Sequence, residues 1–257
     1  MRGQPSSSAQ PQSVGEEQGA WRVAVVIPAR NEAAGIGAAL RSVFECLRHS
    51  DDRIEATCVV VVADACTDAT ARIARGYAAD NPSSVRVIET STGNVGAARA
   101  LGVDVARSLL GTDASSRTWI ANTDADTVVP RDWISSQLRH ADRGFIAVAG
   151  IVDVDDFSDH GPIVQERFRT TYTDRLPTDG SGHPHVHGAN IGIRLDAYDS
   201  IGGWAPESLS EDHQLWNRLL HRGWPTVSPV DVIVTTSGRA VSRCPGGFAD
   251  ALRSHAS

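Results

Sequence analysis

The chain has 257 residues with 24 basic side chains, all of them arginine, and 31 acidic ones, which gives a formal net charge of −7. The lack of lysine excludes a Walker A phosphate loop, the strand lysine of protein kinases and Schiff-base chemistry. We also expect no nucleic-acid partner, because an acidic chain without lysine neutralises phosphates poorly.

The two ends of the chain differ in composition from its middle. Residues 1–20 are polar and lack the apolar core of a signal peptide, so we expect a disordered tail there and a second tail at 236–257. No apolar stretch reaches the roughly 18 residues that span a bilayer. Four cysteines form no CxxC pair, which favours reduced thiols. We expect a cytoplasmic protein, and contact with the inner membrane face stays open.

The first half alternates apolar runs with helical patterns. Strands are predicted at 23–27 (ending at Pro28), 58–62, 85–88 and 118–121, and helices at 36–47, from about 70 through Tyr77, and at 97–110. This βαβαβαβ order predicts a parallel α/β sheet. Right-handed crossovers bring the carboxyl ends of such strands to one edge, where open α/β sheets bind ligands.

The second half is less regular. Apolar runs predict strands at 145–154, 191–193 and 230–235, while 155–184 is polar and has no diagnostic pattern. A helix is predicted at 210–220, with Ser210 as its cap, acids in its first turn and Gly223 at its end.

Polar residues follow each strand of the first half. The strand ends carry Arg30, Asn31 and Glu32, then Asp64 and Asp68, then Asn94 and Arg99, then Asp124 and Asp126. Each cluster alone is more often an ordinary turn, because Asp and Asn favour turns. Four clusters at one sheet edge predict a ligand site.

The segment Asp124-Ala125-Asp126 gives the most specific signal among these clusters. Two carboxylates directly after a buried strand suit a hard divalent cation such as Mn²⁺ or Mg²⁺, which prefers oxygen ligands and keeps positions open for substrate phosphates.

Several segments, in order, resemble family 2 glycosyltransferases. They are residues 25–32, 60–70, 124–126, 188–190 (Gly-Ala-Asn), 202–204 (Gly-Gly-Trp) and 211–212 (Glu-Asp). The resemblance runs from about residue 22 to 235. It implies the GT-A fold, a Rossmann-like and mostly parallel sheet flanked by helices with a smaller acceptor-side region. It also implies sugar transfer from a nucleotide-diphosphate donor.

The resemblance assigns roles on the donor side. Donor-binding residues would be Pro28, Ala29, Arg30, Glu32, Asp64, Asn94, Arg99 and Asp124, and the metal would be held by Asp126 and Asp124. Many members have two acids at the end of the second strand, whereas this chain has Ala63 before Asp64. Arg239 and Arg243 are further donor candidates, because guanidinium groups match phosphate oxygens; a solvated tail is the alternative.

The resemblance also assigns the acceptor side. Asp212 matches the usual general base of inverting members, with Glu211 beside it at the catalytic centre, although acids are common at helix starts anyway. Acceptor-binding candidates are His187, Gly188, Ala189, Asn190 and Trp204. His187 has a polar loop and Trp204 a core position as the ordinary alternative.

The predicted function is therefore metal-dependent transfer of a sugar from a UDP-sugar, or a GDP-sugar, to a hydroxyl group of a small-molecule or lipid-linked acceptor. Residues 21–130 would bind the donor and 131–235 the acceptor. Two alternatives stay open: a sugar-1-phosphate nucleotidyltransferase, although residues 28–35 lack its glycine-rich basic loop, and a non-catalytic nucleotide-sugar-binding protein. The sequence does not predict the oligomeric state.

Overall fold

The computed structural model describes residues 19–49, 52–81, 84–111, 114–160, 162–173, 176, 182–206 and 210–239. Its strands are β1 (Trp21–Ala29), β2 (Ile54–Asp64), β3 (Val85–Thr90), β4 (Thr118–Asn122), β5 (Thr127–Val128), β6 (Ala147–Ala149), β7 (Ile151–Val154), β8 (Ile191–Arg194), β9 (Thr226–Val227) and β10 (Ile233–Thr236). Its α-helices are α1 (Ile36–Arg48), α2 (Thr70–Asp80), α3 (Val95–Leu110), α4 (Trp133–Asp142), α5 (Pro162–Phe168), α6 (Leu195–Ser200) and α7 (Glu211–His221). Short helices of other types are η1 (Ser115–Arg117), η2 (Arg169–Thr173) and η3 (Gly188–Asn190).

A mostly parallel sheet forms the centre of the fold, as the sequence predicts. Its seven strands lie in the order β3-β2-β1-β4-β8-β6-β9. The first four in this order are mutually parallel, and β8 runs antiparallel to both β4 and β6. The carboxyl ends of β1, β2, β3 and β4 therefore lie along one edge, which confirms the predicted arrangement of the first half.

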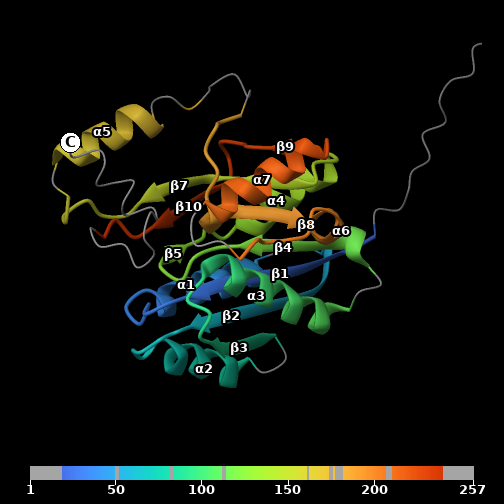
Figure 1. The fold of residues 1–257 in the computed structure, drawn as a ribbon, viewed down its shortest axis with the longest axis horizontal. Helices are drawn as coiled ribbons and strands as arrows, with labels where there is room; N and C mark the ends of the chain where they lie inside the picture. The colour runs from blue at the N-terminus through green and yellow to red at the C-terminus, as the bar shows by residue number, and fades with distance from the viewer. Residues whose placement is uncertain are drawn as a thin grey trace, which may run out of the picture.

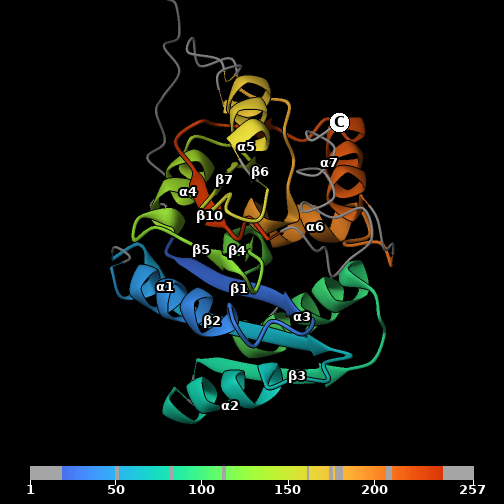
Figure 2. The same cartoon turned by 90° about the vertical axis from the view of Figure 1, so that its left-hand side faces the viewer.

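Helices cover both faces of this sheet (Figure 2). On one face, alternate residues of β1 such as Val23 and Val25 pack with α1 and α4, and on the other face Ala24 and Val26 pack with α3, α6 and α7. Burial on both faces explains why β1 and β2 are continuous apolar runs instead of alternating patterns.

The first strand is longer than its sequence predicts. Pro28 does not end β1 but lies opposite Val62 of β2, and the strand continues to Ala29. The pairing with β4 stops at Val26, opposite Asn122. Beyond that point β1 has a neighbour on one side only, so a residue without an N–H donor costs no ladder hydrogen bond there.

The single strand predicted at 145–154 is wrong, because the chain divides at Gly150. β6 belongs to the large sheet, whereas β7 belongs to a three-stranded sheet in the order β5-β10-β7. A side chain at Gly150 would lie 2.3 Å from Nδ2 of Asn190 and 2.4 Å from the carbonyl oxygen of Val232. Glycine therefore lets the chain pass between the two sheets.

The polar stretch 155–184 contains a helix that its sequence pattern does not indicate. Figure 1 shows α5 at one end of the molecule, beyond β7 and β10. Phe168 of α5 and Tyr172 of η2 pack with Ile151 and Val154 of β7 in a small separate core. Helices α4 and α6 were likewise not predicted. Within the described residues, no helix is both long and apolar enough to cross a membrane.

Helix α7 begins and ends close to its predicted limits, but the predicted cap is wrong. Ser210 has a φ of 57°, and its side chain makes no capping hydrogen bond within the described part of the chain. A capping residue typically has an extended backbone, and Ser210 departs from that conformation. Glu211 and Asp212 fill that turn, and Gly223, with a φ of 71°, follows the end of the helix.

Candidate active site

Asp64, at the end of β2, holds the turn that leads into α3. Its two carboxylate oxygens accept hydrogen bonds from the backbone N–H of Gly93 at 3.1 Å and of Asn94 at 2.9 Å. Asn94 in turn caps α3, because its side-chain oxygen accepts from the N–H of Ala97 at 2.8 Å. Asp64 and Asn94 thus lie together at the sheet edge, and both shape its backbone.

The turn after β1 is fixed by contacts with the loop after β2. Asn31 has a φ of 54°, and its side-chain oxygen accepts from the N–H of Thr67 at 2.7 Å. The N–H of Glu32 donates to the hydroxyl of Thr70 at 2.7 Å. Pro28 and Ala29 are buried in the strand, whereas Arg30 is exposed. Sequence reasoning assigned no role to Thr70, although Thr70 is the last residue of the family-like segment 60–70.

The carboxylates of Glu32 and Asp126 share one cation, the guanidinium of Arg239. Its Nη1 lies 2.6 Å from Oδ2 of Asp126 and 2.9 Å from Oε1 of Glu32. Burial raises the pKa of Asp126 to about 7, although Arg239 acts in the opposite direction. Arg239 therefore lies beside two of the strand-end carboxylates, and its role in donor binding stays a prediction. Arg243 lies outside the described residues.

These oxygens fit a hard divalent cation. Three carboxylate oxygens of Glu32 and Asp126 lie within 3.0 Å of one nitrogen, so they converge on the position of a single positive charge. The described residues contain no group of three or more His, Cys, Asp or Glu side chains that could hold a metal ion. An ion here would thus depend on one or two carboxylates together with substrate phosphates, which is the usual situation of Mg²⁺.

Arg99, from α3, contacts residues predicted for the donor side and residues predicted for the acceptor side. Its Nη2 lies 2.7 Å from Oδ1 of Asp124, and its Nη1 pairs with Glu211. Its guanidinium carbon lies 5.1 Å from the ring centroid of Trp204. Arg99 is only 2% exposed, and Trp204 is buried as well. Both residues lie at the predicted site but below its surface.

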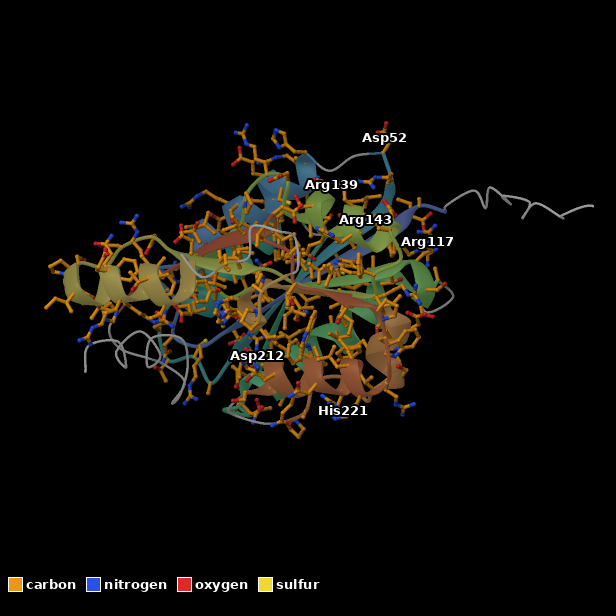
Figure 3. The ribbon with its side chains drawn as sticks, turned by 90° about the horizontal axis from the view of Figure 1, so that it is seen from above. Asp52, Arg117, Arg139, Arg143, Asp212 and His221 are labelled. Carbon is orange, nitrogen blue, oxygen red and sulfur yellow. The ribbon has the colours of Figure 1, made fainter. Side chains whose placement is uncertain are left out.

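Asp212 is held by two backbone groups. Its Oδ2 accepts from the N–H of Gly188 at 3.0 Å, and its Oδ1 accepts from the N–H of His213 at 2.7 Å. Burial lowers the pKa of the neighbouring His187 to about 4, although Asp212 acts in the opposite direction. Figure 3 shows Asp212 at the start of α7.

The rest of the Gly-Ala-Asn turn is buried. The side-chain amide of Asn190 donates to the carbonyl oxygens of Ile151 at 2.8 Å and Val232 at 3.0 Å, and its oxygen accepts from the indole N–H of Trp133 at 2.9 Å. Ala189 is 7% exposed. Asn190 thus links the two sheets beneath the site.

Sequence reasoning also missed Tyr172. Its ring stacks on His185 with 3.9 Å between centroids and lies 5.7 Å from His187. The only signal was the alternation of histidines at 183, 185 and 187, which does not indicate a partner from a distant segment.

Comparison with known proteins agrees with this geometry. The family model described as Glycosyl transferase family 2 matches residues 24–202. The chain belongs to this family. That match contains all the strand-end clusters of the first half and the Gly-Ala-Asn turn. No curated protein matches the sequence.

Solved structures show that this member of the family has the GT-A fold. One is the mannosyltransferase PcManGT from Pyrobaculum calidifontis in complex with GDP-Man and Mn²⁺, with a TM-score of 0.63 and 22% identity. Another is S. aureus TarS 1-349 in complex with UDP-GlcNAc, with a TM-score of 0.63 and 13% identity. The match covers 88% of this chain in both cases, but only 59% and 61% of those chains.

Proposed function

We propose that this chain transfers a sugar from a nucleotide-diphosphate donor to a hydroxyl acceptor, with Asp212 as the general base and inversion at the anomeric carbon. The observation that carries the proposal is the continuity of charged groups across the site. Donor-side Asp124 contacts Arg99, which contacts Glu211 at the start of α7 beside Asp212. The connection between Asp124 and the start of α7 through one guanidinium supports a shared site for donor binding and acceptor activation.

Asp212 is suited to remove the proton of an acceptor hydroxyl. The N–H groups of Gly188 and His213 fix both of its oxygens, so its orientation is set before an acceptor arrives. A positioned carboxylate contributes typically 10²–10⁴-fold as a general base. As Asp212 takes the proton, the acceptor oxygen bonds to C1 of the sugar. The bond from C1 to the diphosphate breaks, and its electron pair leaves with the diphosphate.

The negative leaving group needs positive charge, and the chain has no lysine to supply it. A divalent cation, when bound, would stabilise the diphosphate as a Lewis acid, and Asp126 with Asp124 or Glu32 would hold it. Arg239 lies at the same place and can fork onto phosphate oxygens. We expect Mn²⁺ or Mg²⁺, a UDP-sugar as the first donor to test and a GDP-sugar as the second. The two neighbours were solved with one of each nucleotide type.

The deciding experiment compares Asp212→Asn with Asp126→Ala in a donor panel with Mn²⁺. Asp212→Asn should keep the donor Kd within about threefold and lose at least 10²-fold in transfer, because only the base is removed. Asp126→Ala should lose metal-dependent donor binding as well. Transfer and binding are measured by product chromatography and calorimetry.

Three outcomes would contradict the proposal. Full transfer by Asp212→Asn would remove it as the base, and tight donor binding without turnover in the unaltered protein would favour a non-catalytic role. Release of pyrophosphate from a nucleoside triphosphate would favour a nucleotidyltransferase.

A further inference from the structure

Arg99 differs from the other arginines at the site because solvent does not reach its charge. Its side chain is 3% exposed, and both terminal nitrogens are engaged, Nη2 with Asp124 at 2.7 Å and Nη1 with Glu211. Its Nε is buried and has no hydrogen-bond partner among the described residues. A guanidinium enclosed in this way has no free pair of N–H groups with which to bind a phosphate group.

Acidic neighbours stabilise the charged form of Arg99 in this enclosed position. Burial opposes the charge of Arg99, but Asp124, Glu211 and Asp212 outweigh it and raise the pKa of Arg99 above its usual value. The charge of Arg99 is buried, so removing Asp124 or Glu211 would leave it less compensated and would destabilise this arrangement. The side chains of Arg99, Asp124 and Glu211 therefore keep one arrangement, and this arrangement fixes Asp124 relative to the start of α7.

Gly188 connects this arrangement to Asp212. A methyl group at Gly188 would lie 2.4 Å from Nη2 and 2.5 Å from Cζ and Nη1 of Arg99, so the glycine backbone rests directly against the guanidinium. The N–H of the same glycine donates to Oδ2 of Asp212 at 3.0 Å. A shift of the guanidinium would therefore move the backbone donor that orients Asp212.

We propose that Arg99 is a positioning residue that couples the donor-side carboxylate Asp124 to the acceptor-side pair Glu211 and Asp212, with Gly188 as the contact through which it acts on Asp212. The proposal rests on the proposed function, and it replaces direct donor binding as the role of Arg99. Misplacing a catalytic group by about 1 Å can cost 10²-fold in rate, so the role of Arg99 is visible in kcat.

The test uses two variants that disturb the contact between Arg99 and Gly188, one at each residue. Arg99→Lys keeps the charge but cannot reach both carboxylates. Gly188→Ala keeps every charge and displaces the guanidinium. Each should lower kcat 10- to 100-fold and change the donor KM less than about threefold. Arg107→Lys is the matched control: Arg107 lies on the same helix and pairs with Asp199 at 2.7 Å near the surface.

The double variant separates positioning from general damage. The narrower ammonium of Arg99→Lys leaves room for the methyl group, so adding Gly188→Ala should cost little more than Arg99→Lys alone. Such non-additivity indicates one shared contact. Thermal unfolding of all variants monitors the folded fraction, to which kcat is normalised.

Several results would overturn the inference. A raised donor KM with unchanged kcat would make Arg99 a direct donor ligand, and independent, multiplying losses in the double variant would deny the shared contact. Unchanged kcat in both single variants, with normal transfer by the unaltered protein, would refute positioning alone. No transfer by the unaltered protein with any donor would refute the proposed function as well.

Discussion

At the scale of single residues, the site contains a histidine that is kept neutral. Burial lowers the pKa of His187 from 6.5 to about 4. Between these two values the unfolded chain binds a proton at this position that the folded chain does not. Stability therefore falls as the pH drops from about 6.5 towards 4, because the unfolded state is favoured wherever it binds more protons.

We expect His187→Asn to reduce this pH dependence. The shift corresponds to at most about 3.4 kcal/mol at 1.36 kcal/mol per pKa unit, so the free energy of unfolding should depend less steeply on pH between 6.5 and 4 in the variant. Urea unfolding at a series of pH values measures it. His221→Asn, at the exposed end of α7 (Figure 3), is the control and should keep the full slope. Equal slopes in the unaltered protein and in His187→Asn would contradict the prediction.

At the scale of elements, the passage of the chain from β6 to β7 places one segment in two sheets. Gly150 lies at the crossing, with Asn190 and Val232 where its side chain would be. The side-chain amide of Asn190 donates to the carbonyl oxygens of Ile151 and Val232. The junction of the two sheets and the backbone next to Gly188 therefore depend on one packed region.

Gly150→Ala should destabilise the fold by about 1–3 kcal/mol, the usual cost of overpacking a dense interior. Gly76→Ala is the matched control, because Gly76 lies on the exposed face of α2 with nothing within 4 Å of an added methyl group. There the same change should stabilise by up to about 1 kcal/mol, since alanine favours helices. Chemical denaturation measures both, and a neutral Gly150→Ala would show that the junction relaxes easily.

At the scale of the whole molecule, the site is closed by residues from both ends of the described chain. Arg239 follows β10, the middle strand of the small sheet, and pairs with Glu32 directly after β1. Ser237 also donates its N–H to the carbonyl oxygen of Asp126 at 3.2 Å. A cation that enters between Glu32 and Asp126, as proposed above, would compete with this guanidinium, so metal binding would be linked to the position of the segment 237–239.

We expect Arg239→Ala to bind Mn²⁺ more tightly than the unaltered protein when no nucleotide is present, because the competing guanidinium is gone. The rise in melting temperature on adding Mn²⁺ measures this binding, since a ligand present at 100 times its Kd stabilises the folded state by about 2.7 kcal/mol. Arg194→Ala is the control: Arg194 lies opposite Trp119, at the far end of β4 from the site, and pairs with Asp196. Weaker or equal Mn²⁺ binding by Arg239→Ala would contradict the competition.

The sequence by itself determined the first half of the fold. Apolar runs such as 58–62 are typical of strands buried on both faces, and their alternation with helices favours a parallel order. The clustering of Asp64, Asn94 and Asp126 at one edge follows from that order. The second half was less predictable, because short strands such as β6 and β7 have too few residues to show a period.

Only the tertiary structure decided what each charged residue does. From sequence, Arg99 and Arg239 are both donor candidates. In the fold, Arg99 is enclosed by Asp124, Glu211 and Gly188, whereas Arg239 bridges Glu32 and Asp126 at 27% side-chain exposure. The partners come from segments up to 207 positions apart. Local spacing carries no information on such pairs, since packing of the two sheets and α7 brings them together.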